Sequence, residues 1–278
     1  MKAVLIASSI SIGLALATGS ASAADLLPLK APPPVYSWTG CYIDAGVGYG
    51  MWNQNHYAET YPAPAPVLPL YTPLDLSTTT GGQGWLGRVG GGCDYQVGSS
   101  FVIGAFGDFD FMGLKGNYDD PYNYVVGSEN EPRAWAVGGR IGFLVTPKLL
   151  TYLDGGYTQT RFDQINLSFA GTPISGTLTG PAGAYLPATT YNGWFFGGGT
   201  EYSLWDIVPI RGVFWRTEYR FSSYQAKDLP YLSSTTGAVE GGCGGFVLDG
   251  CGEHMQKYVQ TVTTGFVWKF NFGGSTPW

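Results

Sequence analysis

The chain has 278 residues, a net charge of −6 and only 12% charged residues, whereas a soluble domain carries about 25%. Glycine accounts for 43 residues and aromatic side chains for 15% of the chain. A mildly acidic chain without a basic patch argues against nucleic acid as a partner. Sparse charge with abundant glycine, tyrosine and tryptophan favours strands that face lipid on one side.

The N-terminus has the features of an export signal. A positive start is followed by an apolar stretch and by Ala21-Ser22-Ala23, an A-x-A cleavage site, so residues 1–23 are expected to be removed. Residues 24–37 contain three consecutive prolines, which favour an extended conformation, and we interpret them as a periplasmic lead segment. The remaining residues, 38–278, are long enough to form one barrel domain.

The mature chain contains alternating, strand-like segments and no run of 18 apolar residues, which argues against a membrane helix. Short connections alternate with long ones of about 18 to 31 residues, as in outer-membrane barrels with short periplasmic turns and long extracellular loops. The predicted fold is an all-β, eight-stranded, antiparallel, up-and-down transmembrane barrel. Its strands are expected at 38–52, 84–97, 101–112, 133–145, 149–161, 192–204, 210–223 and 257–272.

The charges inside these segments share one face, opposite the aromatic side chains. A charged side chain that faces lipid at mid-membrane costs about 2–4 kcal/mol, so this sorting predicts that the charges line the interior. Eight strands enclose a space just wide enough for side chains, and unpaired buried charge is costly, so the charges are expected to pair with one another. The predicted interior charges are Asp44, Arg88, Asp94, Asp108, Asp110, Arg140, Asp154, Glu201, Arg216, Glu218, Arg220 and Lys269.

Aromatic residues also occur near the predicted strand ends, where they are expected to form two girdles at the membrane interfaces. The predicted periplasmic girdle contains Trp38, Tyr95, Phe101 and Trp205. The predicted extracellular girdle contains Trp52, Trp85, Trp135 and Trp194.

Four cysteines allow three pairings. Cys243 and Cys251 lie in the last long loop, where a disulfide would tie down the chain. Cys41 and Cys93 lie on adjacent strands with the same parity; a second disulfide and two free thiols are both compatible with the sequence.

Catalytic, cofactor-binding and metal-binding residues are not expected. His56 and His254 fall in or beside loops and are interpreted as solvated. A lipid-modifying enzyme at the rim is the alternative, but His254 has Ser233 and Ser234 only in the same loop, and no spacing specifies an active site. Four acids of the second long loop are interpreted as a solvated cluster, with cation bridging to lipopolysaccharide as the alternative: Asp119, Asp120, Glu129 and Glu131.

Several stretches resemble one family. They are residues 24–50 (ADLLPLKAPPPVYSWTGCYIDAGVGYG), 139–143 (GRIGF), 217–219 (TEY) and 265–270 (GFVWKF). They are similar to the small outer-membrane proteins of alpha-proteobacteria known as porin-family or outer-membrane immunogenic proteins. Cys41 stands where that family usually has Phe, and Asp44 where it has Gly. The resemblance implies an OmpA-like barrel without a peptidoglycan-binding domain.

The predicted location is the outer membrane of a Gram-negative bacterium. Expected partners are outer-membrane lipid and lipopolysaccharide, an extracellular ligand or host surface, and the barrel-assembly machinery, which would read Phe270, Phe272 or Trp278 at the C-terminal end. The sequence favours a non-enzymatic, structural and surface-exposed protein with antigenic or adhesive loops. The alternative is a small porin or uptake channel.

Overall fold

A computed structural model describes residues 37–62, 69–171, 178–208, 210, 212–240 and 250–270. The predicted signal segment, nearly all of the lead segment, and both Phe272 and Trp278 lie outside the described residues, so the predictions about them stay predictions. Within the described ranges, no helix is long and apolar enough to span a membrane.

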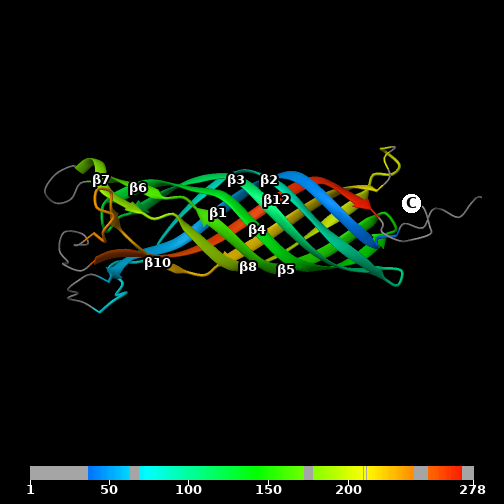
Figure 1. Cartoon of the computed structure of the whole chain (residues 1–278), viewed down its shortest axis with the longest axis horizontal. Helices are drawn as coiled ribbons and strands as arrows, with labels where there is room; N and C mark the ends of the chain where they lie inside the picture. Colours follow the sequence, from blue (N-terminus) through cyan, green and yellow to red (C-terminus); the bar gives the residue numbers. More distant parts are fainter. Residues whose placement is uncertain are drawn as a thin grey trace, which may run out of the picture. The chain divides into compact units, whose positions relative to one another are not determined.

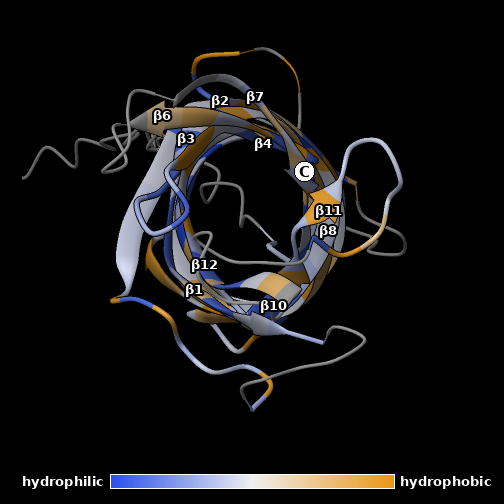
Figure 2. Ribbon diagram, turned by 90° about the vertical axis from the view of Figure 1, so that its left-hand side faces the viewer, coloured by the Kyte–Doolittle hydropathy of each residue, from blue (hydrophilic) through white to orange (hydrophobic). Residues whose placement is uncertain are grey.

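Eight long antiparallel strands close into a ring, as predicted (Figure 2). Each pairs with its neighbour in chain order, and the last pairs with the first from Cys41↔Phe270 to Tyr61↔Gly250. The ring has no open edge, which satisfies the backbone in lipid. Its strands are β1 (Gly40–Tyr61), β2 (Thr78–Val97), β3 (Phe101–Asp120), β4 (Val125–Thr146), β5 (Leu149–Phe162), β8 (Thr189–Ser203), β9 (Val213–Tyr224) and β12 (Gly250–Phe270).

Several strands run further at one end than the sequence predicted. β1 continues to Tyr61 instead of residue 52, and the connection between β3 and β4 is reduced to a turn at 121–124. Beyond Met51 the outward face of β1 carries Asn53 and Asn55, because this part of the wall lies outside the membrane. The backbone pairing therefore continues beyond the last residue of the apolar outer face, which was the feature that marked each strand in the sequence.

Four shorter strands in the long connections were not predicted. They are β6 (Ile165–Gly171), β7 (Leu178–Leu186), β10 (Lys227–Pro230) and β11 (Leu232–Ser233). β6 pairs with the start of β4, and β10 pairs with β12, so both extend the wall of the barrel. β6, β7 and β10 lie at the extracellular end, away from the short turns (Figure 1).

The outward face of the ring is apolar across the membrane-spanning part of every strand. Ile43, Val47 and Met51 on β1 are all close to half exposed, and Trp85 on β2 is 72% exposed. On β12 the exposed apolar face runs from Val262 to Trp268. This band matches the lipid-facing surface predicted from the alternation of the sequence.

Two of the predicted girdle residues face inward instead. Trp38 is fully buried at the periplasmic end, where its ring lies 4.9 Å from that of Phe214 and its Nε1–H donates to the Pro147 carbonyl oxygen at 3.2 Å. Trp52 is 3% exposed. The prediction for these two was wrong for different reasons. Trp52 has the parity of the inward residues of β1. Trp38 precedes β1, and its ring packs against Phe214 inside the barrel.

One disulfide links neighbouring strands. Cys41 and Cys93 are direct register partners on β1 and β2, and the structure joins them. Cys251 is buried at the start of β12. Cys243 lies outside the described residues, so its pairing with Cys251 stays a prediction.

Candidate functional site

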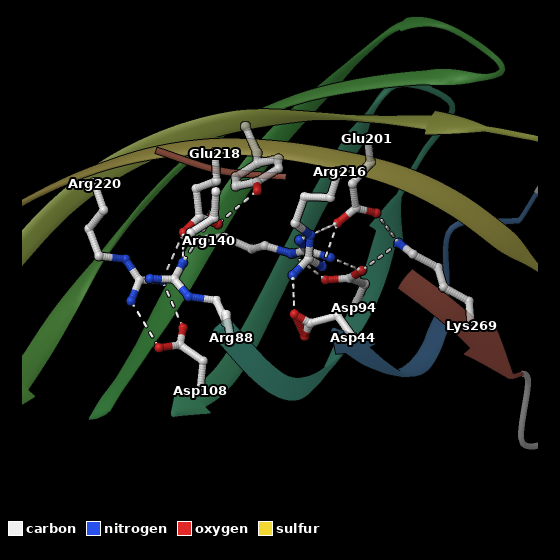
Figure 3. A network of polar contacts seen from close by, with 12 residues as sticks. Asp44, Arg88, Asp94, Asp108, Arg140, Glu201, Arg216, Glu218, Arg220 and Lys269 are labelled. Carbon is white, nitrogen blue, oxygen red and sulfur yellow. Dashed lines mark hydrogen bonds and ion pairs between the residues drawn. The ribbon is translucent and has the colours of Figure 1, made fainter. Parts of the chain in front are cut away.

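The candidate site is the barrel interior. The structure places all twelve predicted charges on the inward face, where each is buried or half-buried. Ion pairs reach between strands that are not neighbours, and they form two layers along the barrel (Figure 3).

The layer nearer the periplasm centres on Glu201 of β8. Its Oε1 accepts hydrogen bonds from Arg140 Nη1 at 2.6 Å and from Arg216 Nη2 at 2.6 Å. Lys269 Nζ lies 3.0 Å from the other carboxylate oxygen of Glu201 and 2.8 Å from Asp94 Oδ2. Arg216 also donates to Asp44 on β1, past the intervening β12. One buried carboxylate thus binds three cations from three other strands.

Aromatic rings close this layer from the periplasmic side. The guanidinium groups of Arg140 and Arg216 each lie 4.7 Å from the ring centre of Tyr42, and Lys269 Nζ lies 4.4 Å from that of Trp38. Cation–π contacts of this kind are strongest where the cation has lost its water. The rings therefore add binding partners for the cations while they fill the lumen.

The second layer lies deeper in the barrel. Arg88 donates to both carboxylate oxygens of Asp110, at 2.7 and 2.8 Å, and to Glu218 Oε1 at 2.7 Å. Arg220 makes the same paired contact with Asp108, at 2.9 and 2.7 Å, and also reaches Glu218. Paired guanidinium–carboxylate contacts combine charge with fixed geometry, so this layer links three strands, β2, β3 and β9.

Asp154 differs from the other interior charges. It is 4% exposed, and neither of its carboxylate oxygens has a hydrogen-bond partner among the described residues. Gly197 on the neighbouring β8 leaves room for the Asp154 side chain, because a Cβ at position 197 would collide with Asp154 Oδ1. Gly104 leaves room for Asp94 in the same way. Inward glycines thus make space for acidic side chains in a narrow lumen.

An apolar layer lies above the charged layers. It includes Trp52, Phe162 and Tyr191, whose rings contact one another edge to face, and it is completed by Leu86, Met112, Leu114, Ala134, Tyr224 and Val259. The fully buried Lys257 lies over it, with Nζ 4.0 Å from the Phe162 ring centre and 2.5 Å from Glu129 Oε1.

A second polar cluster lies inside the extracellular part of the barrel. His56 Nδ1 lies 2.6 Å from Glu253 Oε1, and Tyr231 donates to Asp120 at 2.6 Å. Tyr118 Oη lies 2.6 Å from Tyr231 Oη. Burial lowers the pKa of His56 to about 4 and raises the pKa of Glu253 well above its usual range. Both shifts favour a neutral pair at neutral pH.

Several of these residues were predicted to be solvated in loops, and that prediction was wrong. His56 is 1% exposed, and Asp120, Glu129 and Glu131 are equally buried. Asp119, the neighbour of Asp120, is exposed. The signal that would have found them is parity, because the inward alternation of β1 and β3 continues beyond the last outward aromatic residue.

His254 lies on β12 rather than in a loop. Its side chain is 30% exposed, and Nδ1 lies 2.6 Å from Asp228 Oδ1 on β10. Its ring stacks on Tyr57, with the ring centres 4.7 Å apart. Ser233, the partner considered for a rim enzyme, pairs instead with Ala184 of β7.

A closed eight-stranded ring with an apolar outer face and an ion-paired interior defines an integral outer-membrane β-barrel protein. The chain is 28% identical over 243 residues to the 31 kDa outer-membrane immunogenic protein of Brucella melitensis biotype 1, covering 84% of this chain and 94% of that one. The protein of the same name from Brucella suis biovar 1 matches to the same extent. No family model matches the chain.

Among solved structures, the outer-membrane protein OprG from Pseudomonas aeruginosa aligns over 86% of this chain and all of its own, with a TM-score of 0.51 and 8% identity. This likeness supports the fold alone. The similarity to the Brucella proteins confirms the predicted resemblance, and it confirms the outer membrane of a Gram-negative cell as the location.

Replacing Glu201 by Gln is expected to lower the free energy of unfolding by about 3–5 kcal/mol, because three buried cations lose their shared anion. Guanidinium titration of the protein in detergent micelles measures this. Asp206→Asn removes one partner of the exposed Lys148–Asp206 pair and serves as the control, with an expected loss of at most about 1 kcal/mol. Equal midpoints for wild type and Glu201→Gln would contradict the central role of Glu201.

His56→Gln is expected to flatten the dependence of stability on pH. The unfolded chain protonates His56 below about pH 6.5, whereas the folded chain does so only near pH 4, so wild type loses stability as the pH falls through this window. The variant lacks this contribution, while Glu253 remains in both proteins. Unfolding midpoints at pH 4.5, 5.5 and 7.5 measure the difference; parallel curves would mean that His56 titrates normally.

Proposed function

We propose that this protein is a non-enzymatic, structural barrel of the outer membrane that does not conduct solutes and that displays its extracellular strands and loops at the cell surface. The observation that carries the proposal is the filled lumen. Three apolar clusters occupy successive levels of the barrel, and the two charged layers lie among them.

Two small voids lie between these layers. A void of about 20 Å³ beside Asp44, Arg88 and Asp108 has room for roughly one water molecule. A second void of about 10 Å³ lies beside Asp110 and Tyr224. Moving a solute through the lumen would require several buried ion pairs to break at once. This supports the structural role over the small-porin alternative.

The proposed surface role rests on the length of the extracellular part and on the name of the Brucella relatives, which describes them as immunogenic. Residues 69–77 follow β1 and include Leu76, which is 89% exposed, and Leu70 and Tyr71, which are both 46% exposed. Exposed apolar side chains on a membrane-anchored surface suit contact with antibodies or with a host surface.

The non-enzymatic part of the proposal is supported by the surroundings of His254. His254 is hydrogen-bonded to Asp228 and stacks on Tyr57 on the outer wall of the barrel. Ser233 pairs instead with Ala184 of β7. These contacts do not form a nucleophile–base pair of the kind that acyl transfer requires.

Planar-bilayer recordings of the purified protein are expected to show no large, steady openings, because the lumen is closed at several levels. A trimeric general porin inserted under the same conditions is the positive control. The double variant Phe162→Ala/Tyr191→Ala removes two rings from the middle apolar layer. It tests whether this layer contributes to closing the lumen to ions. Frequent, stable openings of the wild-type protein would refute the structural proposal.

Replacing residues 69–77 by a Gly-Ser linker of equal length is expected to reduce the binding of antibodies, raised against intact cells, to the cell surface. The matched control replaces residues 205–208, in a periplasmic turn, by a Gly-Ser linker of equal length, which is expected to leave binding unchanged. Flow cytometry of intact cells measures both variants. Unchanged antibody binding after replacement of residues 69–77 would show that this segment is not part of the displayed surface.

A further inference from the structure

Three ionisable side chains meet on the outer wall of the barrel, above the membrane. Glu59 on β1, Asp228 on β10 and His254 on β12 each offer one ligand atom, and these three atoms all lie within 4.8 Å of one another. They are separated in the sequence by 169 and 26 positions (228 − 59 and 254 − 228), so no spacing motif reveals them.

The strand register explains how they meet. β12 lies between β1 and β10; His254 is the direct partner of Tyr57 on one side and of Asp228 on the other. Glu59 is opposite Gly252, whose missing side chain leaves room for the Tyr61 ring, and Glu59 lies one position along the same outer face from the Tyr57–His254–Asp228 row. Two acids on different strands thus flank one imidazole on the same face.

Glu59 distinguishes this group from an ordinary solvated acidic cluster. Glu59 is only 1% exposed, and its Oε1 has no hydrogen-bond partner among the described residues. A buried carboxylate oxygen without a partner is unfavourable unless something else binds it. Asp228 and His254 remain partly exposed, at 37% and 30% of their side chains, so an ion has access from the solvent.

The chemistry of the three ligands selects the class of ion. Two carboxylates balance the charge of a divalent cation, and an imidazole nitrogen beside carboxylate oxygens is a common ligand set for Zn²⁺. Ca²⁺ and Mg²⁺ prefer oxygen ligands alone. Three protein ligands leave a fourth tetrahedral position for water.

We propose that Glu59, Asp228 and His254 form a binding site for a divalent transition-metal ion, with Zn²⁺ as the best-fitting case, on the extracellular outer wall of the barrel. The bound ion replaces the hydrogen bond between His254 and Asp228 and supplies the missing partner of Glu59. It links β1, β12 and β10, which joins the barrel seam to a strand of the last long connection.

The test is calorimetric titration of the mature protein with ZnCl₂, in detergent micelles, after treatment with a chelator and without a histidine tag. We expect about one Zn²⁺ per chain and a higher unfolding temperature in its presence, because the ion binds the folded state alone. Glu59→Gln and His254→Gln are each expected to weaken binding at least about tenfold. CaCl₂ at the same concentration is expected not to compete.

Asp119→Asn is the matched control, since it removes an exposed acid from the extracellular part of β3, outside the cluster. It is expected to leave Zn²⁺ binding unchanged. Asp228→Asn, at a more exposed position, replaces Glu59→Gln if the latter fails to fold by circular dichroism. Absence of saturable binding below millimolar Zn²⁺, or equal binding by wild type and His254→Gln, would overturn the proposal.

Discussion

Closure of the sheet by β1 and β12 is the constraint on which the rest of this structure depends. In lipid, every backbone N–H and C=O must find a partner within the protein, and a strand edge cannot be left open. The seam from Cys41↔Phe270 to Tyr61↔Gly250 supplies those partners along the full height of the wall. Once the ring is closed, alternate side chains must face either lipid or the lumen, and no third environment remains within the membrane.

The lumen of an eight-stranded ring is narrow, and this decides how its charges are held. Glu201 binds three cations, and Glu218 binds Arg88 and Arg220, because an unpaired buried charge is costly. Glycines such as Gly104 and Gly197 provide the space for the acids. Aromatic rings and aliphatic side chains pack in the levels between, so the side chains that stabilise the barrel also occupy its lumen.

Above the membrane the wall of the barrel continues, but its side chains differ from those of the membrane-spanning part. The outward face becomes polar, while the inward face continues with the His56–Glu253 cluster and an apolar cluster around Tyr118 and Leu186. β6 and β10 add to the wall here, so the extracellular part is an ordered extension of the barrel over the described residues. That order is what brings Glu59, Asp228 and His254 together on the outer surface.

The sequence by itself determined the fold class, the eight membrane-spanning strands and the inward parity of the twelve charges, because a period of two is local and the difference between lipid and lumen is large. Only the tertiary structure decided which charge pairs with which and how far each strand continues above the membrane, and the interior position of His56 depends on that continuation. Those features depend on strand register and on neighbours distant in sequence. Where both faces of a strand are polar, alternation does not show how far the strand continues, and pairing across the sheet carries that information instead.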